Sequence, residues 1–520
     1  MMSLLPVFSL LIGLASMGLI PCLACAQTAD TLSHRLPPEA IPELGCWFWS
    51  ETDFEPEGYR EFVDLVATHS SYGYLTASLR VPRRELLDAE VHQQLKAAAV
   101  YARERGIEVV MDLDVRLARR AFQARYPDEL QQMLLLHEMS LSGEGAQTAE
   151  IRSRELNDHY TGNTTPYIAL RGEVVRVVSY IMTPTGIDPH SLCDITSACE
   201  VLSASPEAVK VSIPSEQNQA GRTACVMVLF THLAADVFAP HLLAFQRELL
   251  RQYADAPFAG ACKDEWGFPP CFDGNPAKDQ FWYSLAMAVA YAQCSGGRDL
   301  LADCLLMSKA FQGMEETRQA VINYYTHLVW KRNVECETDF YEAVKEVFGP
   351  QTLVATHPTW WPYPDAREMM KNGLDWWAAK RDWAQTDETT PFAARTALTK
   401  KWGSPVWHNM YYSSEKPNYE ASIWQHALAG GRINYHPLYP RDISRIESVK
   451  ELLRGELARA QSRVRLLNFI QKTPLDCPVA VIFGHASAMN WAGPGYNDVG
   501  MAVADALWQA GYPADLIPSS

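Results

Sequence analysis

Residues 88–116 read DAEVHQQLKAAAVYARERGIEVVMDLDVR, and this stretch decides the predicted fold. Residues 88–106 form an amphipathic pattern that closes with basic residues and Gly106, which is typical of a helix and its C-terminal stop. Residues 107–116 are a short apolar run that is typical of a buried strand. Because another strand is predicted just before, at 72–80, the segment predicts two parallel strands joined by a helix.

The same alternation continues along most of the chain. Strands are predicted at 45–50, 72–80, 107–116, 258–266, 352–361, 374–383, 404–412 and 431–437. Helices are predicted between and after them, at 236–255, within 277–348, at 390–403 and at 448–470. Eight strands with interleaved helices match a (β/α)₈ TIM barrel. A doubly wound open sheet is the alternative, but polar and aromatic residues clustered at the strands' carboxyl ends favour the barrel.

Two regions interrupt this alternation. Residues 146–235 show only short Val-rich runs separated by turn residues, which predicts an inserted antiparallel β-domain of the sandwich type. The barrel would then comprise residues 27–145 and 236–470. After a linker, residues 471–520 have the pattern of the start of a Rossmann-like domain. About 45 residues cannot complete such a domain, so we expect it to continue beyond residue 520; a short β-α-β appendage is the alternative.

The N-terminus predicts export. An apolar run from Leu4 to Ile20 leads to Ala24-Cys25-Ala26, which is typical of a signal peptide over residues 1–26, cleaved before Gln27. This predicts a secreted or periplasmic protein without stable membrane insertion. An uncleaved anchor is the alternative, because no basic residue precedes the apolar run. Lipid attachment at Cys25 is disfavoured but not excluded, because Cys22 stands where such sites usually have Leu.

Composition and motifs limit the classes of partner and cofactor that the protein is expected to bind. Of 520 residues, 61 are acidic and 45 basic, giving a formal net charge of −16 that disfavours nucleic acid and anionic membranes as partners. Neutral substrates remain compatible with it. Outside the leader there is no CxxC pair, so we expect no zinc ribbon, although export would permit a bridge such as Cys193–Cys199. The histidines lack ligand spacing, and there is no phosphate loop or GxSxG elbow, so we expect neither metal nor cofactor.

The most distinctive acids lie in GACKDEWGFPP, at residues 260–270. Glu265 falls at the carboxyl end of the fourth predicted strand, where barrels carry their active sites. The neighbouring Trp266 would desolvate this carboxyl group and favour its protonated form, as a general acid requires. The alternative, a helix cap, is weakened by Pro269 and Pro270, because no helix begins there.

A general acid of this kind is expected in glycoside hydrolysis, which also needs a second carboxyl group. The sequence leaves open which residue supplies that second group. Glu388 and Glu415 are the first candidates, with Glu51, Asp114 and Asp382 remaining. Trp faces stack on sugar rings, and Arg, Asn, Asp and His bind hydroxyls. On this basis the predicted substrate-binding residues are Asp264, Trp266, Trp47, Trp49, Asp114, Arg116, His357, Trp360, Arg381, Trp407, His408, Asn409, Tyr411 and His436.

The chain resembles clan-A-type (β/α)₈ glycoside hydrolases, in outline those bacterial β-galactosidases that carry a glutamine-amidotransferase-like trimerisation domain. The stretches that carry the resemblance are FAGACKDEWGF (258–268), TPFAARTALTKKWGSPVWHNMYY (390–412) and PVAVIFGHASAMNWAGPGYNDVGMAVADALWQAGYPADLIP (478–518). The resemblance implies that Glu265 is the acid/base, and that the protein forms a homotrimer if its C-terminal domain is complete.

This sequence departs from that family in three ways. Asp264 stands where the family usually has Asn, and Asn409-Met410-Tyr411 stands where it has the nucleophilic Glu. The β-domain inserted after the third strand is also unusual for the family. The sequence therefore supports two hypotheses. The first is an exported glycoside hydrolase that uses Glu265 as the general acid/base on carbohydrate substrates. The second is a non-catalytic glycan-binding or assembly protein built on a decayed barrel.

Overall fold

The structure is a computed structural model of the chain. It describes residues 43–69, 72–79, 81, 84–113, 119–153, 156–157, 166–167, 169–266, 279–358, 380–386, 406–409, 433–436, 476–484 and 500–517. The chain divides into two compact units, Met1–Arg35 and Leu36–Ser520, and all described residues belong to the second.

An eight-stranded parallel sheet forms the framework for the candidate site. Its strands are β1 (Glu43–Trp49), β2 (Tyr72–Leu79), β3 (Glu108–Asp112), β15 (Phe258–Trp266), β17 (Leu353–Pro358), β18 (Trp383–Thr386), β19 (Val406–Asn409) and β20 (Ile433–His436). They are hydrogen-bonded in that order, each parallel to the next. The end strands β1 and β20 also contact each other, although no ladder joins them among the described residues. The predicted parallel α/β sheet is thus confirmed.

The sixth strand lies later than the sequence predicts. We expected it at 374–383, but β18 begins at Trp383. The charged residues just before it, Lys380, Arg381 and Asp382, pair with residues of helix α8 (Glu315–Phe348). The strand therefore begins only after these side chains have turned toward the helix.

Helices cover one face of this sheet. The first ones are α2 (Tyr59–His69), α3 (Ala89–Arg103) and α5 (Leu242–Gln252), with a short 3₁₀ helix η3 (Glu51–Phe54) after β1. Helix α4 (Arg119–Arg125) instead contacts a strand of the β-rich insertion, β14 (Thr223–Ala235). Helix α5 begins later than residue 236, where the sequence places it. Residues 236–240 form a turn instead, in which the amide of Phe238 donates to the carboxylate of Asp236 and the chain then reaches Pro240.

The two faces of the parallel sheet belong to different apolar clusters. On one face, which we call the outer face, residues such as Val109, Ala261 and Val354 join the large core shared with the helices. Alternate residues form a separate small cluster on the opposite, inner face: Tyr74, Val110, Ala259, Cys262, Leu353 and Ala355. This is the period-two alternation expected of strands covered on both sides.

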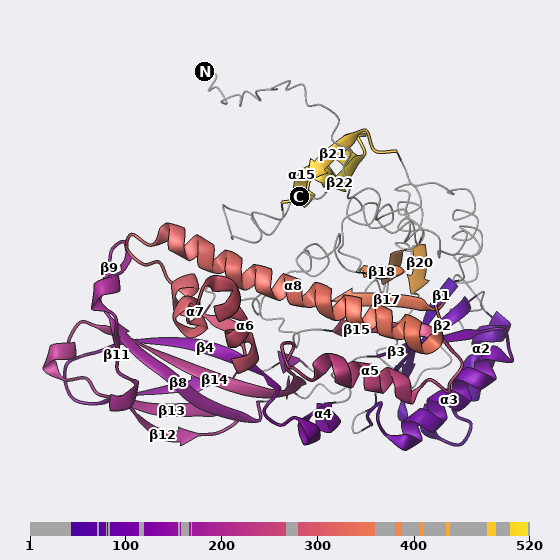
Figure 1. The fold of residues 1–520 in the computed structure, drawn as a ribbon, viewed down its shortest axis with the longest axis horizontal. Helices are drawn as coiled ribbons and strands as arrows, with labels where there is room; N and C mark the ends of the chain where they lie inside the picture. The colour runs from indigo at the N-terminus through magenta and orange to yellow at the C-terminus, as the bar shows by residue number, and fades with distance from the viewer. Residues whose placement is uncertain are drawn as a thin grey trace. The chain divides into compact units, whose positions relative to one another are not determined.

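The β-rich insertion consists mainly of two antiparallel sheets. The five-stranded sheet has the order β11 (Cys193–Asp194), β8 (Arg171–Tyr180), β14 (Thr223–Ala235), β4 (Leu130–Ser140) and β16 (Gln280–Tyr283). The three-stranded sheet has the order β12 (Glu200–Ala204), β13 (Ala208–Ile213) and β5 (Gln147–Arg152). Figure 1 shows β4, β8 and β14 side by side. Shorter elements are β6 (Leu156–Asn157), β7 (Pro166–Tyr167), β9 (Met182–Thr183), β10 (Gly186–Ile187), η6 (Pro189–Ser191), η7 (Thr196–Ala198) and η8 (Gln217–Gln219).

These two sheets pack closely against each other at Gly172 of β8. A Cβ atom at this position would lie 2.6 Å from Cγ2 of Val209 in β13 and 2.6 Å from Cε1 of Phe230 in β14. Such close approach leaves room only for glycine. The arrangement is that of a small sandwich.

The antiparallel strands begin before the predicted boundary of residue 146. Strand β4 starts at Leu130, and β16 pairs with it although the sequence indicates helix throughout 277–348. Both contain short apolar runs, MLLL in β4 and FWY in β16, which periodicity alone does not separate from buried helix.

Three helices follow β16: α6 (Leu285–Ser295), α7 (Leu300–Ser308) and the long α8 (Figure 1). Helix α8 contacts both the five-stranded antiparallel sheet and the eight-stranded parallel sheet. The hydroxyl of Tyr325 donates to the carbonyl of Trp282 in β16, at 2.9 Å. Further along the helix, Glu337 accepts a hydrogen bond of 3.2 Å from the hydroxyl of Thr356 in β17.

The last described elements form a β-α-β unit. Strands β21 (Val479–Ile482) and β22 (Ala514–Ile517) are parallel, and α15 (Met501–Gln509) connects them in sequence. This unit fits both the predicted start of a Rossmann-like domain and the alternative, a short β-α-β appendage. Among the helices that the structure describes, none is both long and apolar enough to cross a membrane.

Candidate active site

The backbone places Glu265 at an irregular point of strand β15. In the pairing of β15 with β17, Asp264 faces His357 and Trp266 faces Pro358, with a register shift between them. Glu265 is therefore the extra residue of a bulge at the carboxyl end of a parallel strand. Bulges re-aim side chains and are common beside active sites.

Close backbone packing fixes the start of this strand. Gly260 has a φ of +150°, and a Cβ there would lie 2.0 Å from the carbonyl oxygen of Leu353 in β17. Only glycine fits such a contact. The small-residue run GAC therefore holds β15 tightly against β17 just before Asp264 and Glu265.

The register brings further predicted site residues to the same edge of the sheet. Asp264 pairs with His357, Trp407 with Asn434, His408 with Tyr435, and Asn409 with His436. Parallel strands end on one side of a sheet, so these positions share an edge with Glu265 and Trp266. The backbone register of these residues agrees with a common site.

The two predicted stacking residues of β1 have a different environment. Trp47 is 2% exposed and Trp49 is fully buried. The ring of Trp47 stacks on Phe62 of α2 with centroids 5.3 Å apart, and Trp49 meets Phe54 of η3 at 5.1 Å. Both indoles thus belong to the core between β1 and its covering helices, because residues two apart on a strand share one face. Neither ring offers the open stacking surface that we expected.

A buried carboxylate anchors this corner of the molecule. Asp53 accepts hydrogen bonds from the indole of Trp47, at 3.1 Å, and from the amide and hydroxyl of Ser50, at 2.8 and 2.9 Å. Burial raises the pKa of Asp53, and these hydrogen bonds lower it in part. The nearby Glu51, one of the remaining candidates for a second catalytic carboxylate, is exposed and pairs with Arg84 at 3.0 Å.

Arg381, predicted to bind substrate, is instead part of the helix–sheet interface. Its guanidinium lies 2.7 Å from the carboxylate of Glu337 in α8, and both side chains have no exposed surface. Asp382, another remaining carboxylate candidate, pairs with Lys345 of α8 at 2.6 Å. Sequence patterns do not show this role, because the partners lie in α8, which is separated from Arg381 by strand β17.

The inner face of the sheet contains a polar pair that is absent from the predicted site residues. Ser78 of β2 donates a hydrogen bond to the carboxylate of Asp112 at the end of β3. They are 3% and 0% exposed, respectively. The alternation in MDLD places Asp112 on the face of Val110, and this is the sequence signal that could have identified it.

Six predicted site residues lie outside the described residues: Asp114, Arg116, Trp360, Glu388, Tyr411 and Glu415. Their roles stay predictions. The cysteines that the structure describes with their side chains include Cys193 and Cys199, both free thiols. Within the same described part of the chain, no group of three His, Cys, Asp or Glu residues is placed to hold a metal ion.

No protein-family model matches this chain, and no curated protein sequence matches it. Solved structures do. One is a rhamnosidase from Novosphingobium sp. PP1Y, with a TM-score of 0.50 and 11% identity over 94% of this chain. The chain spans 64% of that rhamnosidase's length.

Two further matches are weaker in TM-score. A β-galactosidase from the psychrophilic Marinomonas ef1 has a TM-score of 0.48 and 10% identity, covering 92% of this chain and 70% of its own. A GH5_18 protein from Streptomyces cattleya, solved in complex with GlcNAc, has a TM-score of 0.36 and 12% identity, covering 92% of this chain and 93% of its own. At 11% identity the match to the rhamnosidase shows a likeness of fold alone. Because one fold hosts many reactions, the chemistry must be argued from the residues.

Proposed function

We propose that the protein is an exported glycoside hydrolase that cleaves O-glycosidic bonds in oligosaccharides or polysaccharides. The observation that carries the proposal is the position of Glu265, in a bulge at the carboxyl end of a central strand in an eight-stranded parallel sheet. The fold likeness to a rhamnosidase supports the same reaction class.

We further propose that the sheet closes into a (β/α)₈ barrel. The contact between β1 and β20, the two end strands, supports closure. In a closed barrel the carboxyl ends of all eight strands surround one site. The segment 146–235 then forms most of an inserted domain. Residues 471–520 belong to a glutamine-amidotransferase-like domain, which would assemble the protein as a trimer if that domain is complete.

In the proposed reaction Glu265 acts first as an acid. Its carboxyl group donates a proton to the glycosidic oxygen as the bond to the leaving sugar breaks. A second carboxylate, Glu388 or Glu415, attacks the anomeric carbon and forms a glycosyl ester. Glu265, now ionised, removes a proton from water, and the resulting attack releases the sugar and restores both carboxyl groups. This two-step route retains the anomeric configuration.

The test is Glu265→Gln, which keeps the size of the side chain but cannot donate the proton. Hydrolysis of oligosaccharides and unactivated aryl glycosides should fall by about 10²–10⁴-fold, the usual contribution of a general acid. Glycosides with strongly acidic leaving groups should lose much less, because their departure needs no proton. Glu216→Gln is the matched control, since Glu216 is exposed and lies in the antiparallel region. Equal rates for wild type and Glu265→Gln on every substrate would exclude Glu265 as the acid.

A second candidate function is glycan binding without catalysis. It is favoured by one observation: β19 reads VWHN and ends without the catalytic Glu that the family resembled by this chain carries at that position. A binding protein should retain a glycan ligand, show no turnover, and be unaffected by Glu265→Gln. Hydrolysis that depends on Glu265 would exclude this candidate.

A further inference from the structure

A line of polar side chains, which we call the polar row, crosses one face of the five-stranded antiparallel sheet. Direct pairing aligns Tyr283 of β16, Gln132 of β4, Thr231 of β14 and Arg171 of β8. Residues that pair directly in an antiparallel sheet point to the same face. Across four strands the row is therefore about 14 Å long. Glu173, two residues after Arg171, lies on this face beside it.

Hydrogen bonds fix the side chains of the polar row. The hydroxyl of Thr231, which is 2% exposed, accepts from Nε of Arg171 at 3.3 Å and from Nε2 of Gln132 at 3.1 Å. The same nitrogen of Gln132 donates to the carboxylate of Glu173 at 3.4 Å. Arg171 and Glu173 are nevertheless exposed, and Gln132 is half-buried. Side chains that are ordered before a ligand arrives lose less conformational entropy on binding.

The next line of residues on this face is apolar and covered. Leu134 pairs with Phe281 on one side and with Leu229 on the other, and all three side chains belong to the core. The ring of Phe281 contacts that of Tyr325 in α8, with centroids 5.9 Å apart. The face thus changes from a helix-covered core to an open polar surface within one step of the pleat.

Arg171 is the member of this surface with the most unused donors. Only its Nε atom forms a hydrogen bond within the part of the chain that the structure describes, and no carboxylate there pairs with it. Further along β8, Arg176 does form an ion pair, with Asp299 at the N-terminus of α7. A guanidinium group stays charged at all pH values at which proteins fold, and it presents its N–H groups as a rigid fork.

Helix α8 relates the polar row to the candidate catalytic edge. Only four residues separate the end of α8 from the start of β17, so the helix runs antiparallel to the strands of the parallel sheet. Nζ of Lys263, two residues before Glu265, lies 4.3 Å from the ring centroid of Phe340. Tyr325 bonds the carbonyl of Trp282, beside the row, and precedes Phe340 by fifteen residues. This is about 22 Å along the helix, so the row lies beyond the carboxyl end of β15.

We propose that the polar row is a second glycan-binding surface, which binds a neutral polysaccharide several sugars away from the bond that is cleaved. The inference rests on the proposed function, which makes a glycan the substrate. A sugar hydroxyl group both donates and accepts hydrogen bonds. It can accept from the free N–H groups of Arg171 and donate to the carboxylate of Glu173. An anionic sugar would be repelled by Glu173 and a cationic one by Arg171, so the pair matches an uncharged chain.

The test is affinity electrophoresis of the full-length protein in gels that contain galactan, xylan, mannan or mixed-linkage β-glucan as separate probes. Wild type should be retarded by at least one of them. Arg171→Ala should weaken that binding by about ten- to a hundredfold, as expected for the loss of hydrogen bonds from a charged donor. Arg171→Lys should weaken it too, because an ammonium group lacks the fork and the bond to Thr231.

Arg152→Ala is the matched control. Arg152 lies on β5 of the three-stranded sheet, has a side chain that is 75% exposed, and pairs with Glu150. Its removal subtracts the same charge from the inserted region but should leave the retardation as in wild type. Glu173→Ala is a second, independent variant of the proposed surface, and it should weaken binding of the same polysaccharide as Arg171→Ala does.

Three outcomes contradict the inference. The first is that none of the four neutral polysaccharides retards the wild type. The second is that Arg171→Ala or Glu173→Ala, correctly folded by circular dichroism, binds as tightly as Arg152→Ala. The third is Arg171-dependent retardation by polygalacturonate alone, because this would show an anionic ligand. Full binding by Arg171→Lys would show that a positive charge suffices and would contradict recognition by the guanidinium fork.

The outcomes separate this inference from the proposed function. If Glu265→Gln retains full activity and Arg171→Ala loses polysaccharide binding, the role of Glu265 fails and the binding surface stands. If Glu265→Gln is inactive and Arg171→Ala binds as wild type does, only the binding surface fails.

Discussion

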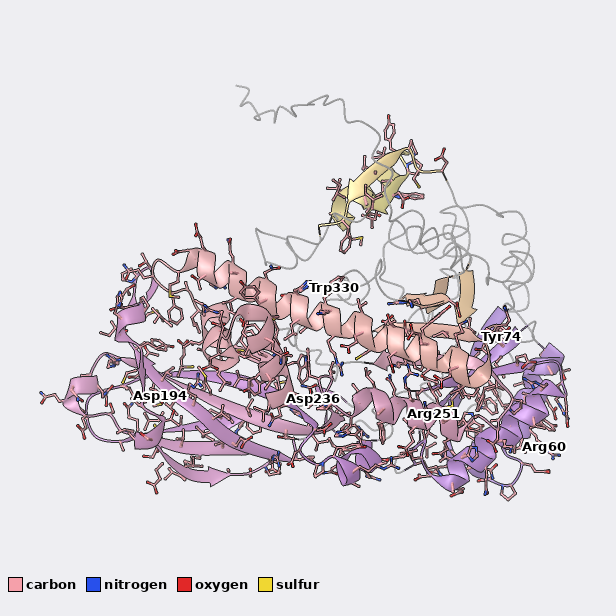
Figure 2. The ribbon with its side chains drawn as sticks, viewed as in Figure 1. Arg60, Tyr74, Asp194, Asp236, Arg251 and Trp330 are labelled. Carbon is pink, nitrogen blue, oxygen red and sulfur yellow. The ribbon has the colours of Figure 1, made fainter. Side chains whose placement is uncertain are left out.

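Asp236 is the buried acid with the clearest expected effect on stability. It follows β14, is 2% exposed, and accepts a hydrogen bond of 3.0 Å from the amide of Phe238 (Figure 2). Burial raises the pKa of its carboxyl group from 3.8 to about 7, although hydrogen bonds from Ser284 and Phe238 and the charge of Arg332 oppose the shift. The folded protein therefore holds a proton on Asp236 at pH values where the unfolded chain has released it.

The sign of the pH dependence follows from this difference. Between about pH 4 and pH 7 the folded state binds the extra proton, so stability decreases as pH rises. Above pH 7 the loss is complete and the contribution is constant.

Asp236→Asn should therefore be more stable than wild type at pH 8 and similar to it near pH 4. The difference should grow by about 1.4 kcal/mol for each pH unit between about pH 4 and pH 7, and stay constant above pH 7. Urea denaturation at several pH values measures it. Asp194→Asn is the control, because hydrogen bonds from Thr196 lower the pKa of this exposed carboxylate. Any pH dependence of stability that this substitution removes should therefore occur only below about pH 4. A pH-independent difference for Asp236→Asn would show that Asp236 is ionised in the fold.

At the scale of secondary-structure elements, helix α8 holds the segment that leads into β18. Lys380, Arg381 and Asp382 pair with Glu342, Glu337 and Lys345 of the helix, at 3.1, 2.7 and 2.6 Å. The carboxylate of Asp382 also accepts from the amide of Val354 in β17, at 3.0 Å. The helix thereby fixes where β18 begins beside β17.

Of the two ion pairs that glutamates of α8 form, only Glu337–Arg381 should contribute strongly to stability; Glu342–Lys380 should not. Glu337→Gln should cost about 3–5 kcal/mol, because it removes the negative charge that lies 2.7 Å from the fully buried guanidinium of Arg381. Glu342→Gln makes the same chemical change in an exposed pair and should cost at most about 1 kcal/mol. Urea denaturation of both variants gives the comparison. Equal small losses would show that Arg381 has another counter-charge that suffices.

At the scale of the whole molecule, the proposed barrel depends on whether β1 pairs with β20. Within the described residues, β1 and β20 contact each other, but no hydrogen-bonded ladder joins them. An open sheet would leave the amides of both strands unpaired on one side, whereas a closed barrel has no edges.

Hydrogen exchange distinguishes these forms. In a closed barrel, amides of β1 and β20 should be protected as strongly as those of interior strands such as β2 and β19. Strand β12 is the internal reference for an edge, because it ends the three-stranded sheet and all five of its residues are exposed. Exchange of β20 as fast as that of β12 would contradict closure.

The sequence by itself determined the local elements and their order. Seven of the eight parallel strands lie where apolar runs predict them, since a strand's periodicity and its turn residues are local properties. The same reasoning placed Glu265 at the end of β15 through the run FAGACKDEW. The start of β18 near Trp383 was missed because side-chain contacts with the distant helix α8 delay it. The start of α5 was missed because a local turn, in which the amide of Phe238 donates to Asp236, precedes the helix.

The environment of each side chain was decided by the tertiary structure alone. Whether Trp47 offers a stacking surface or packs on Phe62, and whether Arg381 meets a substrate or Glu337, depends on elements remote in sequence. The pairing of β16 with β4 and of Ser78 with Asp112 is likewise non-local. A sequence pattern gives which face a residue occupies within its own element, but only packing decides what covers that face.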